Sequence, residues 1–390
     1  MTAWLLPERF SDVLPREAAA IEQLRRTLLD HATSHGYELV IPPLLEYVES
    51  LLSGTGQDLE QQTFKLVDQV SGHMLGLRAD MTPQAARIDA HLLNRQGLVR
   101  LCYCDSIVHT HAQGVYATRQ PLQFGVELYG HAGLEADLEV QHLALHSLRL
   151  AGYDKLALGL SDARLVRGVL GGLVAGPLRL SAMLEALSRK DVPRLRELTA
   201  ALPQAQREPI LALTELFGDA GVLQEARRVL PAREPVLRAL DDLERLARLH
   251  EQAGCDVQVD LADLRGYHYH SGVIFGLYAP DRPDALARGG RYDEVGATFG
   301  RSRPATGFSM DLRELVRGMR APAPRAAVRA QWSEEPGYVQ AVRALREAGD
   351  VVIELPAGAE FEGESFRLDR ELVRAEGGWA VRACAPSAAA

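Results

Sequence analysis

The sequence lacks several features that would assign it to a simple functional class. Only four of its 390 residues are cysteines, and no second Cys or His pair at zinc-ligand spacing accompanies Cys102 and Cys104. We therefore expect reduced thiols and no metal site. No apolar run approaches the roughly 18 residues of a membrane span, and no basic segment followed by an apolar one opens the chain. We expect a soluble, cytoplasmic protein that contacts no membrane.

Excess positive charge is also missing. The chain has 43 Lys and Arg against 52 Asp and Glu, a formal net charge of −9. Proteins that hold a large nucleic acid need clustered cations to neutralise phosphates, so this balance argues against such a partner. There is neither a Walker loop nor a Gly-x-Ser-x-Gly motif. Local motifs therefore imply no cofactor.

Short strands and helices fill the first part of the chain. Apolar residues at helical spacing predict a helix over 16–35, which Gly36 ends. A second helix is expected over 83–95, with Thr82 as its cap and Pro83 in its first turn. Strands are expected at 37–41, 63–67, 73–78, 98–106 and 123–129. Hairpin-paired strands with helices outside predict an α+β fold with an antiparallel sheet.

The later part of the chain suggests an insertion and a small module. Leucines at a helical period predict a helical insertion over about 164–252, which either packs on its own core or offers a partner surface. Within it, Asp191 is expected to cap a helix. The segment Arg320–Arg325 is typical of a linker, so we expect a core over 1–320 and an α/β module over 326–383. Strands are also expected at 256–260, 272–278 and 351–355, a helix at 338–348, and disorder at 386–390.

Four polar clusters interrupt otherwise apolar segments. They are Arg78–Pro83, Gln123–Glu127, Arg265–Gly272 and Gly289–Asp293. Gln123 and Glu127 are four residues apart on a strand, so both side chains face the same way. A buried carboxylate at Asp80 or Glu127 needs an internal partner or a cationic ligand. Alternatively these polar groups are structural, and Gly289 and Gly290 only allow close strand packing.

The order and wording of the clusters resemble the catalytic core of histidyl-tRNA synthetase, a class II synthetase. Pro7–Pro15 looks like its N-terminal signature, and Tyr37–Pro43 looks like motif 1, which builds the dimer interface. Gly289–Asp293 and Pro304–Phe308 are similar to its glycine-rich strand and the approach to motif 3. The resemblance covers roughly residues 5–317. It implies a class II synthetase-like antiparallel sheet flanked by helices, and a dimer.

The resemblance also implies a histidine pocket of seven residues. Asp80, Thr82 and Gln123 would hold the α-ammonium, Arg265 the carboxylate, and Glu127, helped by Tyr269 or His270, the imidazole. Asp80 is one methylene shorter than the family's glutamate, and His270 replaces a tyrosine. Arg265 has an alternative role in a surface salt bridge.

Two departures from the family remove the arginines that clamp ATP. The motif 2 arginine falls at His109 and its acidic neighbour at His111, where the loop has either lost its role or changed it. Glu314 stands where the motif 3 arginine belongs, and a unit charge ~4 Å from a phosphate is worth about 4 kcal/mol. Arg313 is rotated by about 100° around the helix and should point elsewhere. We expect no aminoacylation and no catalytic residues.

A synthetase-like chain without these clamps resembles one paralogous family, the regulatory subunits of ATP phosphoribosyltransferase. Arg78–Gln84, Leu101–Cys104 and Glu127–Asp137 carry this closer match. It implies a short-form catalytic subunit as partner, L-histidine as feedback effector, and a role in the first step of histidine biosynthesis. Two alternatives stay open. One is an active histidyl-tRNA synthetase, which the short C-terminal segment disfavours; the other is a stand-alone histidine sensor or tRNA-binding adaptor.

Overall fold

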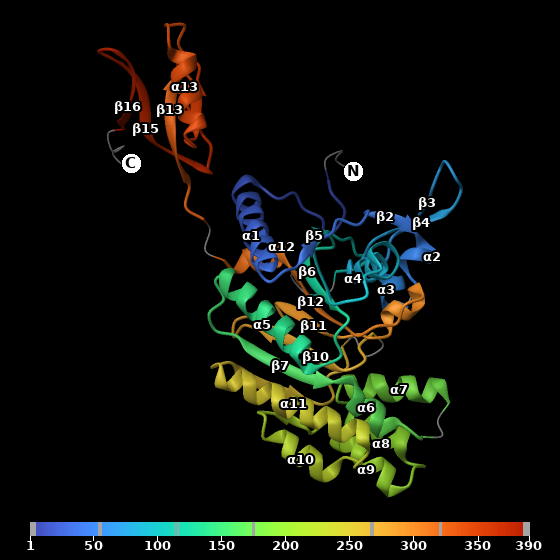
Figure 1. Ribbon diagram of the computed structural model, residues 1–390. Helices are drawn as coiled ribbons and strands as arrows, with labels where there is room; N and C mark the ends of the chain where they lie inside the picture. The colour runs from blue at the N-terminus through green and yellow to red at the C-terminus, as the bar shows by residue number, and fades with distance from the viewer. Residues whose placement is uncertain are drawn as a thin grey trace. The chain divides into compact units, whose positions relative to one another are not determined.

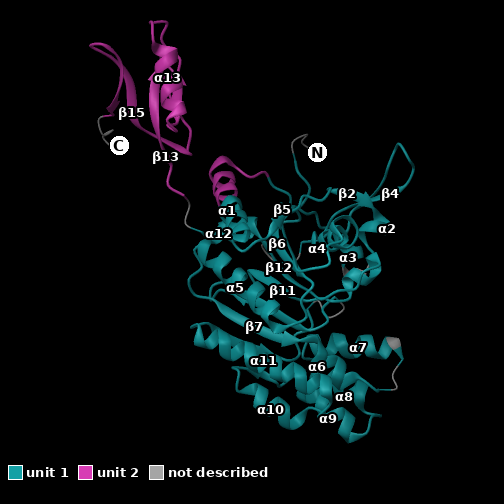
Figure 2. Cartoon of the chain, viewed as in Figure 1, with its two compact units in different colours: residues 1–11, 24–319 teal, residues 12–23, 320–390 magenta. Residues whose placement is uncertain are grey.

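The computed structural model describes residues 5–53, 57–112, 114, 117–173, 176–265, 269–319 and 322–384. Two compact units divide the chain (Figure 2). The first comprises residues 1–11 and 24–319, and the second comprises residues 12–23 and 320–390. The boundary near the N-terminus falls within α1 (Pro15–Ser34), which matches the helix predicted over 16–35.

A nine-stranded sheet forms the centre of the first unit, in the order β1-β5-β6-β12-β11-β10-β7-β9-β8 (Figure 1). Neighbouring strands are antiparallel except for the parallel pairs β1–β5 and β7–β9. This confirms the predicted α+β fold. The strands are β1 (Glu38–Leu39), β5 (Val99–Ser106), β6 (Leu122–Tyr129), β7 (Ala157–Asp162), β8 (Phe217–Gly218), β9 (Asp256–Asp260), β10 (Val273–Tyr278), β11 (Ala287–Arg291) and β12 (Ala305–Asp311).

Helix α5 (Leu134–Leu150) packs across the middle of this sheet, against β6, β10, β11 and β12 (Figure 1). Its buried face contains Val140, Leu143, Ala144 and Leu148. These residues recur every three or four positions, so they form one apolar stripe on the helix. A short helix, α12 (Leu312–Gly318), follows β12 and contacts β6.

A small three-stranded sheet, in the order β2-β4-β3, lies before the first polar cluster. Its strands are β2 (Leu45–Tyr47), β3 (Lys65–Val67) and β4 (Met74–Leu77), with α2 (Val48–Leu51) and α3 (Gln57–Gln62) between them. The helix expected over 83–95 is two elements, α4 (Thr82–Arg87) and a π-helix, η1 (Ile88–Leu93).

The prediction that Thr82 caps this helix is wrong. Met81 occupies the cap position, and no side-chain cap bond forms there. The Thr82 backbone N–H instead donates to Asp80 Oδ1 (3.1 Å), and the Thr82 hydroxyl lies 3.0 Å from the Tyr103 hydroxyl. The Asp80 carboxylate thus satisfies the first backbone donor, which leaves the threonine hydroxyl free for an internal contact.

Residues 163–252 form the mainly helical insertion, and its helices also pack against β7, β9 and β10. Its helices are α6 (Ala163–Leu170), α7 (Pro177–Ser188), α8 (Val192–Thr199), α9 (Gln204–Ala212), α10 (Val222–Val229) and α11 (Glu234–Gln252). Leu187, Leu195, Leu240 and Leu243 are fully buried, as their helical period predicts. Asp191 caps α8 by accepting a hydrogen bond from the Arg194 N–H, which confirms that prediction.

The C-terminal unit contains a four-stranded sheet in the order β14-β13-β15-β16. Its elements are β13 (Arg325–Gln331), α13 (Tyr338–Glu347), β14 (Val352–Leu355), β15 (Phe366–Ala375) and β16 (Gly378–Ala383). Val328, Tyr338, Val342 and Leu372 form its small core. The expected linker ends where β13 begins, at Arg325, and the segment expected to be disordered, 386–390, lies outside the described residues.

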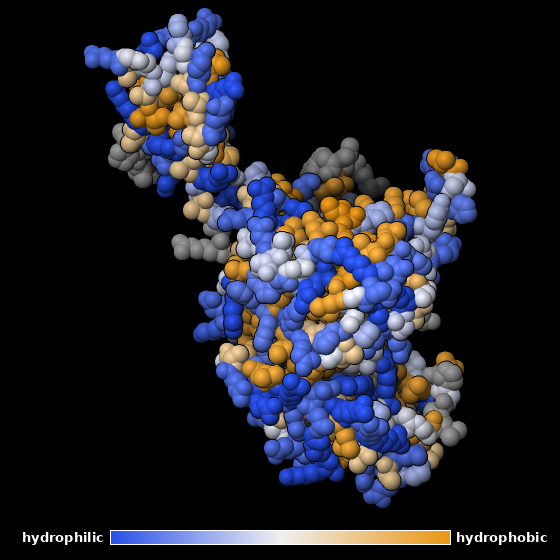
Figure 3. All heavy atoms as spheres, viewed as in Figure 1, coloured by the Kyte–Doolittle hydropathy of each residue, from blue (hydrophilic) through white to orange (hydrophobic). Residues whose placement is uncertain are grey.

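An exposed group of hydrophobic side chains covers β1, β2 and the hairpin of β3 and β4. We call it the apolar patch; hydrophobic residues gather on this face in Figure 3. Its members are Leu39, Ile41, Leu44, Leu45, Tyr47, Leu66, Val67 and Met74. Ile41 is 74% exposed, so it contributes almost nothing to the fold of an isolated chain. No helix within the described ranges is long and apolar enough to span a membrane.

Candidate functional site

The first unit contains a cavity of about 910 Å³ beside strands β6, β12 and β11 of the large sheet. Its walls come from α3, the loop before α4, the loops after β5, β9 and β10, strands β6, β11 and β12, and α12. Three of the seven predicted pocket residues, Asp80, Gln123 and Arg265, line it. The fold therefore brings residues from three of the four polar clusters to one place.

Asp80 and Gln123 form a single hydrogen-bonded unit. Gln123 Nε2 donates to Asp80 Oδ1 (2.8 Å), while Gln123 Oε1 accepts from the Met81 N–H (2.9 Å). Both contacts fix the carboxylate at the cavity wall. Since ionised carboxylates are acceptors only, Asp80 can receive an ammonium group from a ligand through its remaining oxygen.

Arg265 lines the same cavity, yet it already has partners. Its guanidinium pairs with Asp263 through two hydrogen bonds and donates to the Tyr278 hydroxyl (2.6 Å). The salt bridge considered from the sequence therefore forms. A ligand carboxylate would have to share this arginine with Asp263.

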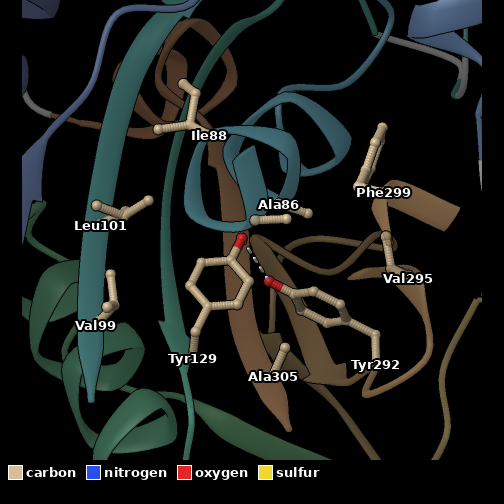
Figure 4. Packing of buried hydrophobic residues seen from close by; sticks show 10 residues of the cluster. Ala86, Ile88, Val99, Leu101, Tyr129, Tyr292, Val295, Phe299 and Ala305 are labelled. Atoms are coloured by element: carbon tan, nitrogen blue, oxygen red, sulfur yellow. Dashed lines mark hydrogen bonds between the residues drawn. The ribbon is translucent and has the colours of Figure 1, made fainter. Parts of the chain in front are cut away.

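Glu127 lies behind the cavity in a fully buried cluster of tyrosines. The Tyr103 hydroxyl donates to Glu127 Oε1 (2.9 Å), and the Tyr292 hydroxyl donates to Oε2. Thr82 joins the cluster through its contact with Tyr103. Figure 4 shows the rings of Tyr129 and Tyr292 with their hydroxyl groups directed at each other, 3.5 Å apart.

Two glycines make the space for this cluster. Gly307 on β12 pairs with Glu127 on β6, and a Cβ atom there would lie 1.9 Å from Glu127 Oε2. Gly125 pairs with Tyr103, and a Cβ atom there would lie 2.5 Å from the tyrosine ring. Neither position can hold a larger residue without displacing the groups around the carboxyl.

Burial raises the pKa of Glu127 to about 8, although the Tyr292 and Tyr103 hydroxyls lower it in part. Burial thus disfavours the ionised form of this carboxyl group in the ligand-free chain. An approaching imidazolium could provide the missing positive partner, since an opposite charge favours the ionised carboxyl.

Tyr269 and His270 complete the set. The Tyr269 ring lies 5.1 Å from that of Tyr292, and the His270 ring packs edge-on against Tyr269. The Tyr269 hydroxyl is buried and makes no well-formed hydrogen bond to any described residue. Burial raises the pKa of Tyr269, and the nearby Thr82 opposes this rise only in part. A polar atom left in this state is suited to a ligand group.

The seven residues thus fall into two adjoining groups. Asp80, Gln123 and Arg265 face the cavity, whereas Thr82, Glu127, Tyr269 and His270 belong to or adjoin the buried cluster, and Gln123 with Glu127 joins the two along β6. The sequence did not reveal Tyr103 and Tyr292 as partners of Glu127. For Tyr103, the available signal in the sequence was Gly125, whose missing side chain leaves space for a large ring on the neighbouring strand. Residues 266–268 of the third polar cluster lie outside the described residues.

We expect the free energy of unfolding to fall between about pH 4.5 and 8 because of Glu127. The unfolded chain releases this proton near the ordinary pKa of 4.5, while the folded chain holds it until about 8. Over that window the contribution falls by at most about 1.4 kcal/mol per pH unit. Urea unfolding of wild type and Glu127→Gln should therefore differ in slope against pH. If the free energy of unfolding of the two proteins depends on pH in the same way, the raised pKa does not belong to Glu127.

Comparison with known proteins identifies the family. Residues 9–315 match the family "Histidyl-tRNA synthetase", and residues 325–382 match the "ATP phosphoribosyltransferase subunit HisZ C-terminal domain". The chain is 54% identical to the ATP phosphoribosyltransferase regulatory subunit of Paraburkholderia phytofirmans, over 98% of this chain and 100% of the relative. The chain belongs to the family of ATP phosphoribosyltransferase regulatory subunits. The relative from Variovorax paradoxus is also 54% identical, with the same coverage of both chains.

Solved structures agree with this family. A regulatory subunit/histidyl-tRNA synthetase from Bacillus halodurans superposes with a TM-score of 0.80 at 27% identity, covering 93% of this chain and 95% of the other. Histidyl-tRNA synthetase from Nostoc gives a TM-score of 0.76 at 19% identity, over 98% and 97% of the two chains. The class II synthetase-like fold predicted from the sequence is thereby confirmed.

His109 and Glu314, expected from the sequence to stand in place of the ATP-clamping arginines, line the cavity. His109 is buried, and its Nε2 lies 2.8 Å from the Ala79 carbonyl oxygen, so it carries the donor proton there. Burial lowers the pKa of His109, which leaves the ring neutral at pH 7. His111 is exposed and contacts only Thr110 among the interactions described. The motif 2 position therefore offers no positive charge.

At the motif 3 position, Glu314 lines the cavity while Arg313 points away from it. The Arg313 guanidinium is buried and donates to the carbonyl oxygens of Gln120 and Ser11, as the helical rotation predicted. Four arginines and five acidic residues line the cavity. Such a mixed wall does not supply the net positive charge that a triphosphate requires.

Proposed function

We propose that this chain is a non-catalytic regulatory subunit that binds L-histidine in the cavity and transmits its presence to the catalytic subunit of ATP phosphoribosyltransferase. The observation that carries the proposal is a division within one site. Acceptors for an ammonium and an imidazole remain at Asp80 and Glu127, whereas neutral His109 and acidic Glu314 replace the ATP clamps. The site thus suits an amino acid and disfavours its activation.

The ligand chemistry supports histidine in particular. Asp80 and Gln123 present acceptor oxygens for the α-ammonium, and Arg265 supplies a guanidinium edge for the carboxylate. The distal group of the ligand would reach Glu127 and the buried Tyr269 hydroxyl. A side chain with two N–H groups, such as imidazolium, can satisfy both. An apolar side chain would leave the Tyr269 hydroxyl unpaired, at a cost of about 1–3 kcal/mol.

Reconstitution with a short-form catalytic subunit tests this function. We expect phosphoribosyl transfer to ATP to require this chain, and added L-histidine to inhibit the complex. The same preparation should show no histidine-dependent ATP–pyrophosphate exchange. Exchange activity would identify an active synthetase instead. If the rate of phosphoribosyl transfer is the same with and without this chain, the remaining alternative is a stand-alone sensor.

We also propose that a second copy of the chain covers the apolar patch. Strand β1 is the edge of the nine-stranded sheet, and Ile41, two residues after it in the chain, is largely exposed. Apolar side chains next to an open strand edge form a self-complementary surface, because a twofold axis places the same residues on both sides. The motif 1 resemblance of Tyr37–Pro43 supports the same partner.

Ile41→Arg is expected to weaken the dimer by at least about 100-fold. Each apolar side chain contributes about 1.5–3 kcal/mol on burial, and twofold symmetry applies the change twice. Sedimentation velocity measures the effect. Leu178→Arg is the matched control, because Leu178 is 90% exposed but lies on α7 in the insertion. An Ile41→Arg protein that sediments like wild type would exclude this surface.

A further inference from the structure

Buried polar side chains connect the apolar patch to the wall of the cavity. Gln84 on α4 is 1% exposed, and its Nε2 donates to the Pro43 carbonyl oxygen (2.8 Å) and to Glu46 Oε1 (2.7 Å). Arg87, almost one turn further along α4, pairs with the same Glu46 oxygen. Glu46 lies on β2 between Leu45 and Tyr47, two members of the patch.

Arg78 makes a second connection between the same two regions. It is 1% exposed, and its Nη1 donates to the Pro42 carbonyl oxygen (2.7 Å), next to the patch. Its Nε donates to the Ser106 carbonyl oxygen (2.8 Å), and its Nη2 pairs with Asp105. Along the chain it precedes Asp80, the ligand-facing carboxylate, by two residues. One side chain therefore ties the patch segment to β5 and to the cavity wall.

We call Arg78, Gln84, Arg87 and Glu46 the polar link. A buried charged or amide group that loses its hydrogen-bond partner is destabilised by its desolvation. The members of such a network are therefore expected to move together. Two of its buried atoms, Gln84 Oε1 and Arg87 Nε, have no hydrogen-bond partner among the described residues. The link is thus incompletely satisfied in the single chain. A small shift of residues 42–46 against α4 can change its bonding.

We propose that the polar link couples occupation of the apolar patch to histidine affinity, so that the dimer binds histidine more tightly than the monomer. This inference rests on the histidine site and the dimer proposed above. When a second copy covers the patch, it holds the segment around Ile41 and Glu46 in place. Through Gln84 and Arg87 that segment fixes α4. Helix α4 begins at Thr82, beside Asp80, so the ligand-facing groups are positioned before histidine arrives.

Thermodynamic reciprocity makes the coupling measurable from either end. If dimer formation raises histidine affinity, each bound histidine must tighten the dimer by the same factor, typically 5- to 150-fold. The ratio of histidine dissociation constants between a monomeric variant and the wild-type dimer reports this factor directly. It needs no knowledge of how tight the dimer is.

The test is a four-protein cycle in the full chain, with calorimetric titration of L-histidine. The proteins are wild type, Ile41→Arg, Glu46→Gln and the double variant. We expect Ile41→Arg to bind histidine at least fivefold more weakly than wild type. In the Glu46→Gln background the same change should alter affinity by less than about twofold, because the link to α4 is already weakened. Glu46→Gln keeps the side-chain volume but removes the negative charge that pairs with Arg87.

Glu38→Gln provides the matched control. Glu38 lies on β1 in the same surface region and forms a two-bond salt bridge with Arg95, but it has no contact with α4 among the described interactions. In that background the Ile41→Arg effect should persist in full. If Ile41→Arg weakens histidine binding as much in the Glu46→Gln background as in wild type, the coupling is overturned. It is also overturned if wild type and a monomeric Ile41→Arg protein bind histidine equally well. Absent histidine binding or an absent wild-type dimer overturns the proposed function, and the coupling with it.

Discussion

Replacing Glu127 with alanine is expected to weaken histidine binding by roughly 10- to 150-fold. A hydrogen bond to a charged group contributes about 1.5–3 kcal/mol, and the alanine variant has no acceptor for the imidazole N–H. The carboxyl is completely buried and receives hydrogen bonds from Tyr103 and Tyr292, so no water replaces it readily. Calorimetry with L-histidine measures the change.

Two further variants separate binding from folding. Glu127→Gln keeps the shape and one acceptor, so its affinity should lie between those of wild type and Glu127→Ala. Glu139→Ala is the control, because Glu139 also accepts from a tyrosine hydroxyl, that of Tyr37, but does not line the cavity. Its histidine affinity should match wild type. Full affinity in a folded Glu127→Ala protein would place the effector site elsewhere.

Gly307→Ala is expected to lower the free energy of unfolding by about 1–3 kcal/mol or more. The added Cβ would lie 1.9 Å from Glu127 Oε2 and 2.4 Å from the Val126 carbonyl oxygen. The latter is backbone, so the strand itself must move, and overpacking of this kind is destabilising. Because the displaced group is the Glu127 carboxyl, histidine affinity should fall as well.

Gly97→Ala is the matched control for this substitution. Nothing lies within 4 Å of a Cβ atom at Gly97, and its φ is not in the left-handed region. An alanine there should leave stability unchanged or raise it slightly, since it restricts the unfolded chain. Urea unfolding midpoints compare the two variants. Equal midpoints would contradict the expectation that there is no space for a Cβ atom at Gly307 between β6 and β12.

Local patterns predicted α1 and strands β1, β3, β4, β5, β6, β9 and β10 of the core. They predicted neither α5, β7 and β12 nor the partners of the site residues. Alternation along β6 places Gln123, Gly125 and Glu127 on one face, and this follows from the strand period alone. That Tyr103 and Tyr292 meet Glu127 depends on the pairing of β6 with β5 on one side and, through β12, with β11 on the other. Strands β11 and β12 are far from β6 in the chain. Such register is a long-range property, so no local window contains it.

Other differences have local causes. Asp263 stands two residues before Arg265, so the salt bridge that occupies this arginine was visible in the sequence. Thr82 was predicted to cap a helix because threonine favours that role, but Asp80 supplied the acceptor. Strands β15 and β16 were missed because most of their side chains are only half-buried, which weakens the alternation that identifies a strand.

The tyrosine cluster around Glu127 gives the two units different optical signatures. Trp4 is the one tryptophan in the sequence of the first unit, whereas Trp332 and Trp379 belong to the C-terminal unit. Tryptophan emission therefore reports largely on that unit, whereas Tyr103, Tyr129, Tyr269 and Tyr292 dominate the near-ultraviolet signal of the histidine site. One unlabelled sample can thus distinguish melting of the module from a change in the site.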